Sequence, residues 1–235
     1  MKILKARGKY LKEKVTHNSL IGIAFLAGFL ILIASFFYTS LGVFSLIFSV
    51  IAFFASMSFF RKSISNLQGI QGEEEVIKAL SVLDDTYVLI NDVNLAGGAG
   101  NIDHIVLGPN GVFVIETKNY SGVVVCSGDS WLRHYSGTRR RRNFGLGSPS
   151  RQAKRNALSV KKVVESVKGF CRMNIWVDAV VVFPNPHVKL HLKNPTITIL
   201  RSEELPNYIL TRKLNYQLSP NEIREIGQVI MKESN

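Results

Sequence analysis

The sequence predicts an α/β domain preceded by two membrane-spanning helices, and three features of the chain support this prediction. An uncharged apolar run covers 18–60 of the 235 residues. Helix-like and strand-like segments alternate over the rest of the chain, whose length is usual for one or two domains. Acidic and basic residues interrupt two apolar strands between 103 and 118, where unpaired charges would be costly to bury.

The uncharged run is long enough for two helices that cross a bilayer. It has 43 residues without Asp, Glu, Lys or Arg, and one crossing needs about 20 apolar residues. Its most polar part is 38–42, so we expect helices over 19–38 and 41–60, joined by a very short loop. A buried helix pair of a soluble protein is the alternative, but neither helix has a polar face. A signal peptide would have a shorter apolar core.

Both flanks of this run are basic. Residues 1–17 contain six Lys and Arg against one Glu, and Arg61 and Lys62 follow the second helix. The positive-inside rule therefore predicts a multi-pass membrane protein with two helices and with both termini in the cytoplasm. The basic N-terminus is also suited to anionic lipid headgroups.

Beyond the membrane segment we expect a linker at 61–68, a globular domain at 69–185 and a C-terminal extension of strand and helices at 186–235. Apolar residues at helical spacing predict a helix over 69–83, and a second helix over 150–168 begins at a Ser cap, either Ser148 or Ser150. Apolar or alternating segments predict strands at 87–95, 101–108, 111–118, 121–126, 130–135, 175–183 and 196–200, and the last helices are expected at 202–213 and 219–233.

Three charged residues stand near the ends of two neighbouring strands: Asp103 in the first, Glu116 and Lys118 in the second. Side chains alternate across a strand, so Glu116 and Lys118 share a face. A two-residue loop at Pro109-Asn110 sets Asp103 opposite Glu116, whereas the same loop one position later sets it opposite Lys118. A three-residue loop would separate the groups, so the cluster depends on the register of the two strands.

Paired carboxylates beside a lysine suit metal-assisted phosphodiester cleavage. Two adjacent carboxylates repel each other, and a divalent cation removes the conflict. Carboxylate oxygens suit Mg²⁺, which is bound through one or two carboxylates together with water and substrate phosphates. A lysine two residues further on can hold the attacking water or stabilise a phosphate. The alternative is a structural ion pair at the end of a strand, and the spacing does not decide between the two.

Three segments resemble a known family. They are GEEEVIKAL at 72–80, IDHIVLGPNGVFVIETKNYSG at 102–122 and SPSRQ at 148–152. Together they resemble the nuclease-related domain, NERD, which is similar to the PD-(D/E)XK restriction-endonuclease-like nucleases. The resemblance covers about 69–185 and implies a restriction-endonuclease-like αβββαβ core with a central mixed sheet.

The resemblance also implies roles for residues of the two strands. Asp103 and Glu116 would bind the metal, Mg²⁺ or alternatively Mn²⁺, and Thr117 would add its backbone carbonyl. Lys118 would position the water or stabilise the transition state. These roles agree with the chemistry expected from the residue types.

Two helical residues complete the catalytic set that the resemblance implies. Glu73 matches the glutamate of the family's Gly-Glu pair on the first helix, and Gln152 matches the glutamine of an Asn-Pro-x-x-Gln motif on the second helix. Ser148 stands where that motif has asparagine, which weakens a loop contact but leaves the metal ligands intact.

A basic stretch follows the two strands. Residues 133–172 contain 12 Lys and Arg and one acid, nearly the whole excess charge of the chain. We expect sequence-nonspecific binding of nucleic acid there, since clustered basic residues neutralise phosphates. Anionic lipid is the alternative partner. The residues proposed to contact nucleic acid are Arg139, Arg140, Arg141, Arg142, Arg151, Lys154 and Arg155.

The sequence thus predicts a membrane-anchored, cytosol-facing, metal-dependent nuclease. The alternative is a non-catalytic, membrane-tethered module on the same fold that binds nucleic acid or another partner. The presence of Asp103, Glu116 and Lys118 together favours the enzyme, because a binding module needs no paired carboxylates at that point.

Overall fold

The computed structural model describes residues 1–5, 10–38, 42–96, 100–134, 143–145, 147–167, 175–213 and 216–234. The chain divides into two compact units. One consists of Lys9–Gln71 and is called the hairpin unit below. The other combines Met1–Gly8 with Gly72–Asn235 and is called the α/β unit.

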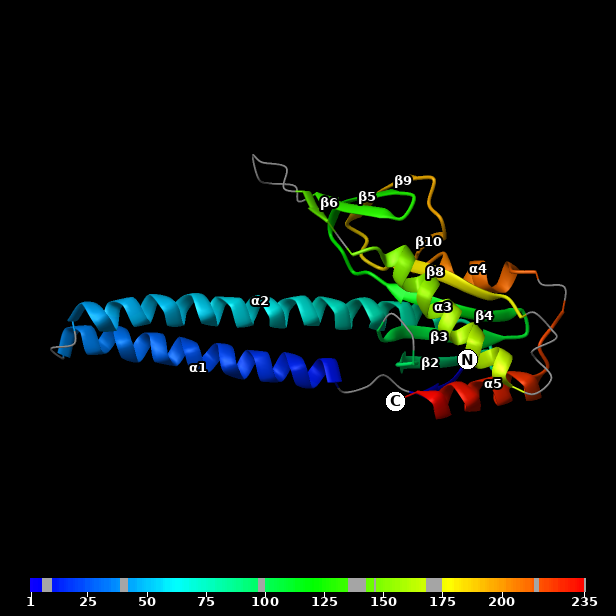
Figure 1. Ribbon diagram of the computed structural model, residues 1–235, viewed down its shortest axis with the longest axis horizontal. Coiled ribbons are helices and arrows are strands. Elements are labelled where there is room, and N and C mark those ends of the chain that lie inside the picture. The colour runs from blue at the N-terminus through cyan, green and yellow to red at the C-terminus, as the bar shows by residue number, and fades with distance from the viewer. Residues whose placement is uncertain are drawn as a thin grey trace. The chain divides into compact units, whose positions relative to one another are not determined.

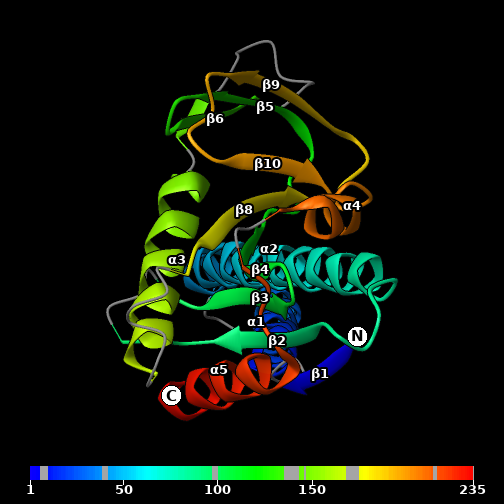
Figure 2. The same cartoon turned by 90° about the vertical axis from the view of Figure 1, so that its right-hand side faces the viewer.

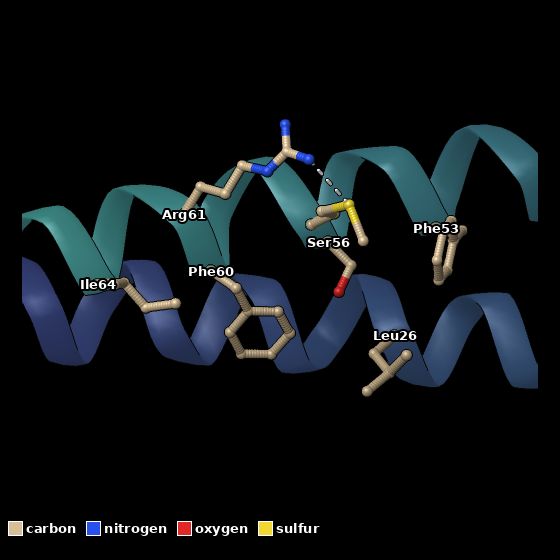
Figure 3. Close-up of a pocket in the computed structure, with 7 residues that line it drawn as sticks. Leu26, Phe53, Ser56, Phe60, Arg61 and Ile64 are labelled. Atoms are coloured by element: carbon tan, nitrogen blue, oxygen red, sulfur yellow. Dashed lines mark hydrogen bonds between the residues drawn. The ribbon is translucent and has the colours of Figure 1, made fainter. Parts of the chain in front are cut away.

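The hairpin unit is built from helix α1 (Tyr10–Tyr38) and most of helix α2 (Gly42–Leu80). Both helices are long and apolar enough to cross a membrane, and the break between them falls where the sequence predicts it. They pack through small and aromatic side chains. Ser56 Oγ donates to the Gly22 carbonyl at 2.9 Å, and a methyl group added at Gly22 would lie 3.3 Å from the Phe60 ring. Figure 3 shows Ser56 and Phe60 of α2 directed toward α1.

The predicted linker at 61–68 is wrong, because α2 is one continuous helix from Gly42 to Leu80 (Figure 1). The segment contains neither proline nor glycine. Nothing in it therefore interrupts the backbone hydrogen bonds of a helix that has already begun. The helix predicted to begin at 69 is the last part of α2.

The first residues form a strand that the sequence does not predict. Strand β1 (Lys2–Lys5) pairs in parallel with β2 (Val88–Val93), with Lys2 opposite Val88. Leu4 packs closely against Gly227, where an added methyl group would lie 2.8 Å from the leucine. Part of the basic segment 1–17 is thus an edge strand of the α/β unit. The alternation of Lys with only two apolar residues is too short a pattern to indicate a strand.

The α/β unit contains a central mixed sheet of six strands in the order β1-β2-β3-β4-β8-β10. Strand β3 pairs antiparallel with β2 and β4, whereas β8 is parallel to β4 and β10 is parallel to β8. From the end of α2, the helices and strands of this sheet follow in the order helix, three strands, helix, strand, and three strands of a second sheet are inserted before the second helix. The predicted αβββαβ core with a central mixed sheet is therefore confirmed. The strand bounds are β3 (Ile102–Gly108), β4 (Gly111–Thr117), β8 (Val177–Phe183) and β10 (Thr198–Arg201).

Helices cover both faces of this sheet (Figure 2). On one face, α3 (Pro149–Ser166) and α5 (Pro220–Glu233) bury residues such as Val160 and Ile226 against the strands. On the other face, the end of α2 and α4 (Leu205–Thr211) bury Val76, Leu80 and Ile209. Strand β4 is buried along its whole length. Any charge at its end is therefore held in a low-dielectric environment.

A second, smaller sheet has the order β7-β6-β5-β9. It packs Val124, Cys126 and Trp131 against Phe183 of the central sheet. Strand β9 lies in the C-terminal extension and is not predicted, although its sequence VKLHLK alternates apolar and polar residues. The bounds are β5 (Gly122–Ser127), β6 (Ser130–His134), β7 (Asn143–Gly145) and β9 (Val188–Lys193).

Candidate active site

The turn between β3 and β4 selects the first of the registers considered above. Gly108 pairs with Gly111 across a two-residue turn at Pro109-Asn110, and the antiparallel ladder continues to His104 opposite Ile115. One further step along this register sets Asp103 opposite Glu116. Gly111 has φ 127°, a conformation that glycine adopts without strain and other residues rarely do.

Asp103 is held by the backbone of the facing strand. Its Oδ2 accepts a hydrogen bond from the Thr117 N–H at 2.7 Å. This bond orients the carboxylate toward the end of β4. The Thr117 hydroxyl oxygen is buried and has no hydrogen-bond partner among the described residues.

Glu116 is the most deeply buried acid of the cluster, with 1% of its side chain exposed. Its pKa is raised from 4.5 to about 8, first by burial and then by the nearby Asp103 carboxylate, while Lys118 opposes the rise. Lys118 Nζ donates to Glu116 Oε1 at 2.5 Å. The other oxygen, Oε2, is buried without a hydrogen-bond partner among the described residues. A buried acceptor left in this way costs about 1–3 kcal/mol, so a further group bound at this oxygen would relieve that cost.

Lys118 lies at the centre of the cluster. Burial lowers the pKa of its ammonium group, but the carboxylates of Glu116 and Asp103 outweigh burial and the pKa is raised. Lys118 is therefore charged at neutral pH. Its Nζ also lies 3.4 Å from Oε1 of Gln152, in the first turn of α3. The helix begins there because Ser148 caps it, accepting a hydrogen bond from the Arg151 N–H at 3.2 Å.

Glu73 approaches the cluster from α2. It is 9% exposed, and its charge contributes to the raised pKa of Glu116. The close approach of α2 depends on the preceding Gly72, where an added methyl group would lie 2.6 Å from Cβ of Asn119. The structure thus brings together Glu73, Asp103, Glu116, Lys118 and Gln152, from two helices and two strands.

The carboxylates fit a hard cation that keeps part of its water. Within the described residues, no group of three or more His, Cys, Asp and Glu is arranged to hold a metal ion through protein ligands alone. Asp103 and Glu116 nevertheless supply two opposed carboxylates, and Glu116 Oε2 lacks a partner there. Mg²⁺ binds in this manner, through one or two carboxylates with waters and substrate phosphates.

Basic residues of α3 line a cavity whose lining includes none of the five clustered residues. Arg151, Lys154 and Arg155 line a cavity of about 480 Å³ together with Ser148. Lys154 is already engaged, because its Nζ pairs with Asp129 Oδ2 at 2.7 Å. The four arginines predicted to bind nucleic acid at 139–142 lie outside the described residues.

Sequence reasoning missed the network around Asp129. Its carboxylate accepts hydrogen bonds from Lys154, from Ser150 at 2.6 Å and from Thr196 at 2.5 Å. These bonds hold the pKa of Asp129 well below its usual range. Its partners come from α3 and from the segment before β10. No spacing in the sequence links these segments, and the network joins the small sheet to the helix that carries Gln152.

Comparison with known proteins shows the family of the chain. The family model of NERD, the nuclease-related domain, matches residues 68–184. An uncharacterized protein of Bacillus anthracis is 41% identical over 66 residues, which are 26% of this chain and 31% of that protein. The match thus spans about a third of the length of that relative. No solved structure matches the chain. Residues 68–184 contain the whole αβββαβ core and all five clustered residues, and the chain belongs to the family of nuclease-related domain proteins.

Proposed function

We propose that this chain is a membrane-anchored, metal-dependent nuclease that hydrolyses phosphodiester bonds. The observation that carries the proposal is the buried Glu116 carboxylate, which faces Asp103 and has one oxygen without a partner among the described residues. A structural ion pair would need Lys118 and one acid. The second acid and the raised pKa of Glu116 are unfavourable for stability and are typical of functional sites.

Each clustered residue has a role that follows from its position. Asp103 and Glu116 would hold Mg²⁺ or Mn²⁺, with Thr117 as a further ligand through its carbonyl oxygen. When bound, the ion would supply a Lewis acid that polarises a phosphate oxygen and lowers the pKa of a bound water. Lys118 donates a hydrogen bond to Glu116 and presents a positive charge to the phosphate. Gln152 orients the lysine, since its Oε1 lies 3.4 Å from Nζ.

Membrane anchoring rests on the hairpin unit and on the pairing of β1 with β2. Strand β1 precedes α1 and β2 follows α2, and the two strands pair side by side. Both ends of the hairpin must therefore leave the bilayer on the same side. The basic flanks favour the cytoplasm as that side. A membrane-impermeant thiol reagent should label Glu13→Cys and Glu75→Cys only after cells are opened, and labelling in intact cells would contradict this topology.

The experiment that tests the nuclease uses the full chain, because β1 belongs to the α/β unit and a fragment starting after the hairpin would lack it. Labelled single-stranded and double-stranded DNA and RNA are incubated with Mg²⁺, Mn²⁺ or EDTA. We expect metal-dependent cleavage that falls at least about 100-fold in Asp103→Asn and in Glu116→Gln, the scale on which one group at a reaction centre acts. The matched control is Glu75→Gln, which removes a half-exposed acid from α2 and should leave cleavage unchanged.

A non-catalytic binding module is the second candidate. The 2.5 Å contact with Lys118 Nζ already gives Glu116 a partner without a metal. If the folded chain binds nucleic acid but cuts none of the four substrates in either metal, the binding module replaces the nuclease.

A further inference from the structure

A groove runs beside helix α3, against the first residues of β8 and the segment before β10. Its volume is about 380 Å³. Trp176 is 56% exposed there and Leu158 is 54% exposed. Two large apolar side chains exposed in one groove of a soluble unit favour a binding role over packing. Other lining residues include Lys154, Lys161, Asp178 and Thr198.

Trp176 is held at this position by neighbours from other elements. Its backbone N–H donates to the Tyr216 hydroxyl at 3.1 Å, and its indole nitrogen lies 3.5 Å from Asp178 Oδ1. Asp178 in turn accepts a hydrogen bond from Tyr208 at 2.8 Å and pairs with Arg212 at 3.1 Å. The carboxylate is thereby neutralised inside the unit. The groove presents an ordered aromatic ring rather than a negative charge.

The groove adjoins the basic cavity described above. Lys154 lines both of them, and Arg151 and Arg155 line the basic cavity. Lys161 contributes a second ammonium group to the groove itself, and its Nζ lies 3.7 Å from Glu165 Oε1. Aromatic surface flanked by basic residues is the arrangement that binds single-stranded nucleic acid, in which bases stack on rings and phosphates meet Lys and Arg.

The position of the groove relative to the candidate active site follows from the strand register. Thr117 pairs with Val182, and Val112 pairs with Val177, which follows Trp176. Trp176 is thus six residues from Val182, the residue of β8 that pairs with Thr117 at the site. At about 3.3 Å per residue of strand, this separation is roughly 20 Å. Gln152 of the site and Lys154 of the groove are two residues apart on α3. A strand of several nucleotides would reach from the site to Trp176.

We propose that this groove binds an unpaired base of single-stranded nucleic acid by stacking on Trp176, with flanking phosphates at Lys161 and at Arg151 and Arg155 of the adjoining cavity. The inference rests on the proposed function and specifies its substrate class as single-stranded. A base inside a duplex is already stacked on its neighbours and offers no free face to the indole. DNA and RNA share the chemistry of the base face, so both are tested.

The test measures binding by the full chain in EDTA, so that no cleavage occurs. The probes are labelled 20-mers of oligo(dT) and oligo(U) and a 20-base-pair duplex, followed by fluorescence anisotropy. Trp176→Ala should weaken single-strand binding roughly 5- to 140-fold, the scale of one base stacked on an aromatic side chain, with duplex binding unchanged. Trp176→Phe keeps a ring and should retain most of the affinity. The control Leu210→Ala removes another exposed apolar side chain, 53% exposed on α4, and should change nothing.

A second readout reports contact with the indole directly. The chain has two tryptophans, and the other, Trp131, is only 3% exposed. Single-stranded probe should therefore quench the fluorescence of the natural chain and leave that of Trp176→Phe unchanged. Equal affinity of the natural chain and Trp176→Ala for single strands, or equal losses for single strands and duplex, would overturn the inference. If the chain cleaves duplex and this cleavage does not depend on Trp176, the single-strand inference is wrong and the proposed nuclease function stands. If a folded chain binds none of the probes, both the single-strand inference and the proposed function are wrong.

Discussion

Replacing Glu116 by glutamine should stabilise the α/β unit at alkaline pH, because glutamine has the shape of a protonated glutamate. The pKa of Glu116 is raised from 4.5 to about 8, chiefly by burial. At about 1.4 kcal/mol per pKa unit, ionising this group in the folded state costs at most about 5 kcal/mol. Between pH 4.5 and pH 8 the folded state binds more protons than the unfolded state, so protonation of Glu116 favours folding. This contribution of Glu116 to the free energy of unfolding is complete below pH 4.5 and is lost as the pH rises to about 8.

Tryptophan fluorescence can follow this unit alone. Trp131 and Trp176 both belong to the α/β unit, and the hairpin unit has no tryptophan. Urea unfolding of the full chain in detergent is measured at pH 5, 7 and 9 for the natural chain, Glu116→Gln and the control Glu75→Gln. We expect the difference in unfolding free energy between Glu116→Gln and the natural chain to grow by several kcal/mol from pH 5 to pH 9. The control should follow the natural chain throughout.

The effect of added Mg²⁺ on the stability of the chain distinguishes a metal site at Glu116 from a carboxyl group that is only destabilised by burial. A cation that binds the folded state only will stabilise it by mass action. At pH 8, 10 mM Mg²⁺ should therefore raise the urea midpoint of the natural chain and leave that of Glu116→Gln unchanged. Parallel pH profiles for the natural chain and Glu116→Gln would refute the reasoning that burial holds this carboxyl group protonated.

Two further substitutions test the packing that supports the site and the hairpin. Gly72→Ala brings a methyl group within 2.6 Å of Asn119 and should destabilise the α/β unit by about 1–3 kcal/mol, as overpacking does, and reduce cleavage as well. Its control Gly69→Ala has nothing within 4 Å and should be neutral or stabilise α2 by up to about 1 kcal/mol, so equal losses in both would contradict the assigned contact. Ser56→Ala removes the hydrogen bond to Gly22 and should weaken the hairpin by about 0.6 kcal/mol, measured by steric-trap unfolding in a bilayer mimetic.

Much of the fold could be predicted because its signals are local. The uncharged run 18–60 dictates two long apolar helices, and the polar residues near 38–42 separate them in the structure as expected. Strands β2, β3, β4 and β8 correspond to runs of apolar and β-branched residues. Of the strands that were missed, β1 has four residues and two of them are lysines, whereas β9 alternates apolar and polar residues and could have been found from that pattern.

The candidate site also combines features that the sequence predicts with contacts that it does not predict. The residue types and the single face shared by Glu116 and Lys118 follow from the sequence, as does the need to neutralise two neighbouring acids. The approach of Glu73 depends on contact between Gly72 and Asn119, and the engagement of Lys154 depends on Asp129, which is 25 residues away. Such contacts join segments whose separation along the chain carries no information about their distance in space.

The sequence by itself determined most of the elements, the two long apolar helices and the kinds of side chain at the end of β4. Only the tertiary structure decided which acid faces which, because three turns between β3 and β4 were compatible with the sequence and each gives a different register. The Pro109-Asn110 turn sets Asp103 opposite Glu116, and a shift by one residue would have moved every side chain of the strand to the other face. Burial of β4 between two helical layers then raises the pKa of Glu116, and that property belongs to the packed molecule rather than to any segment of it.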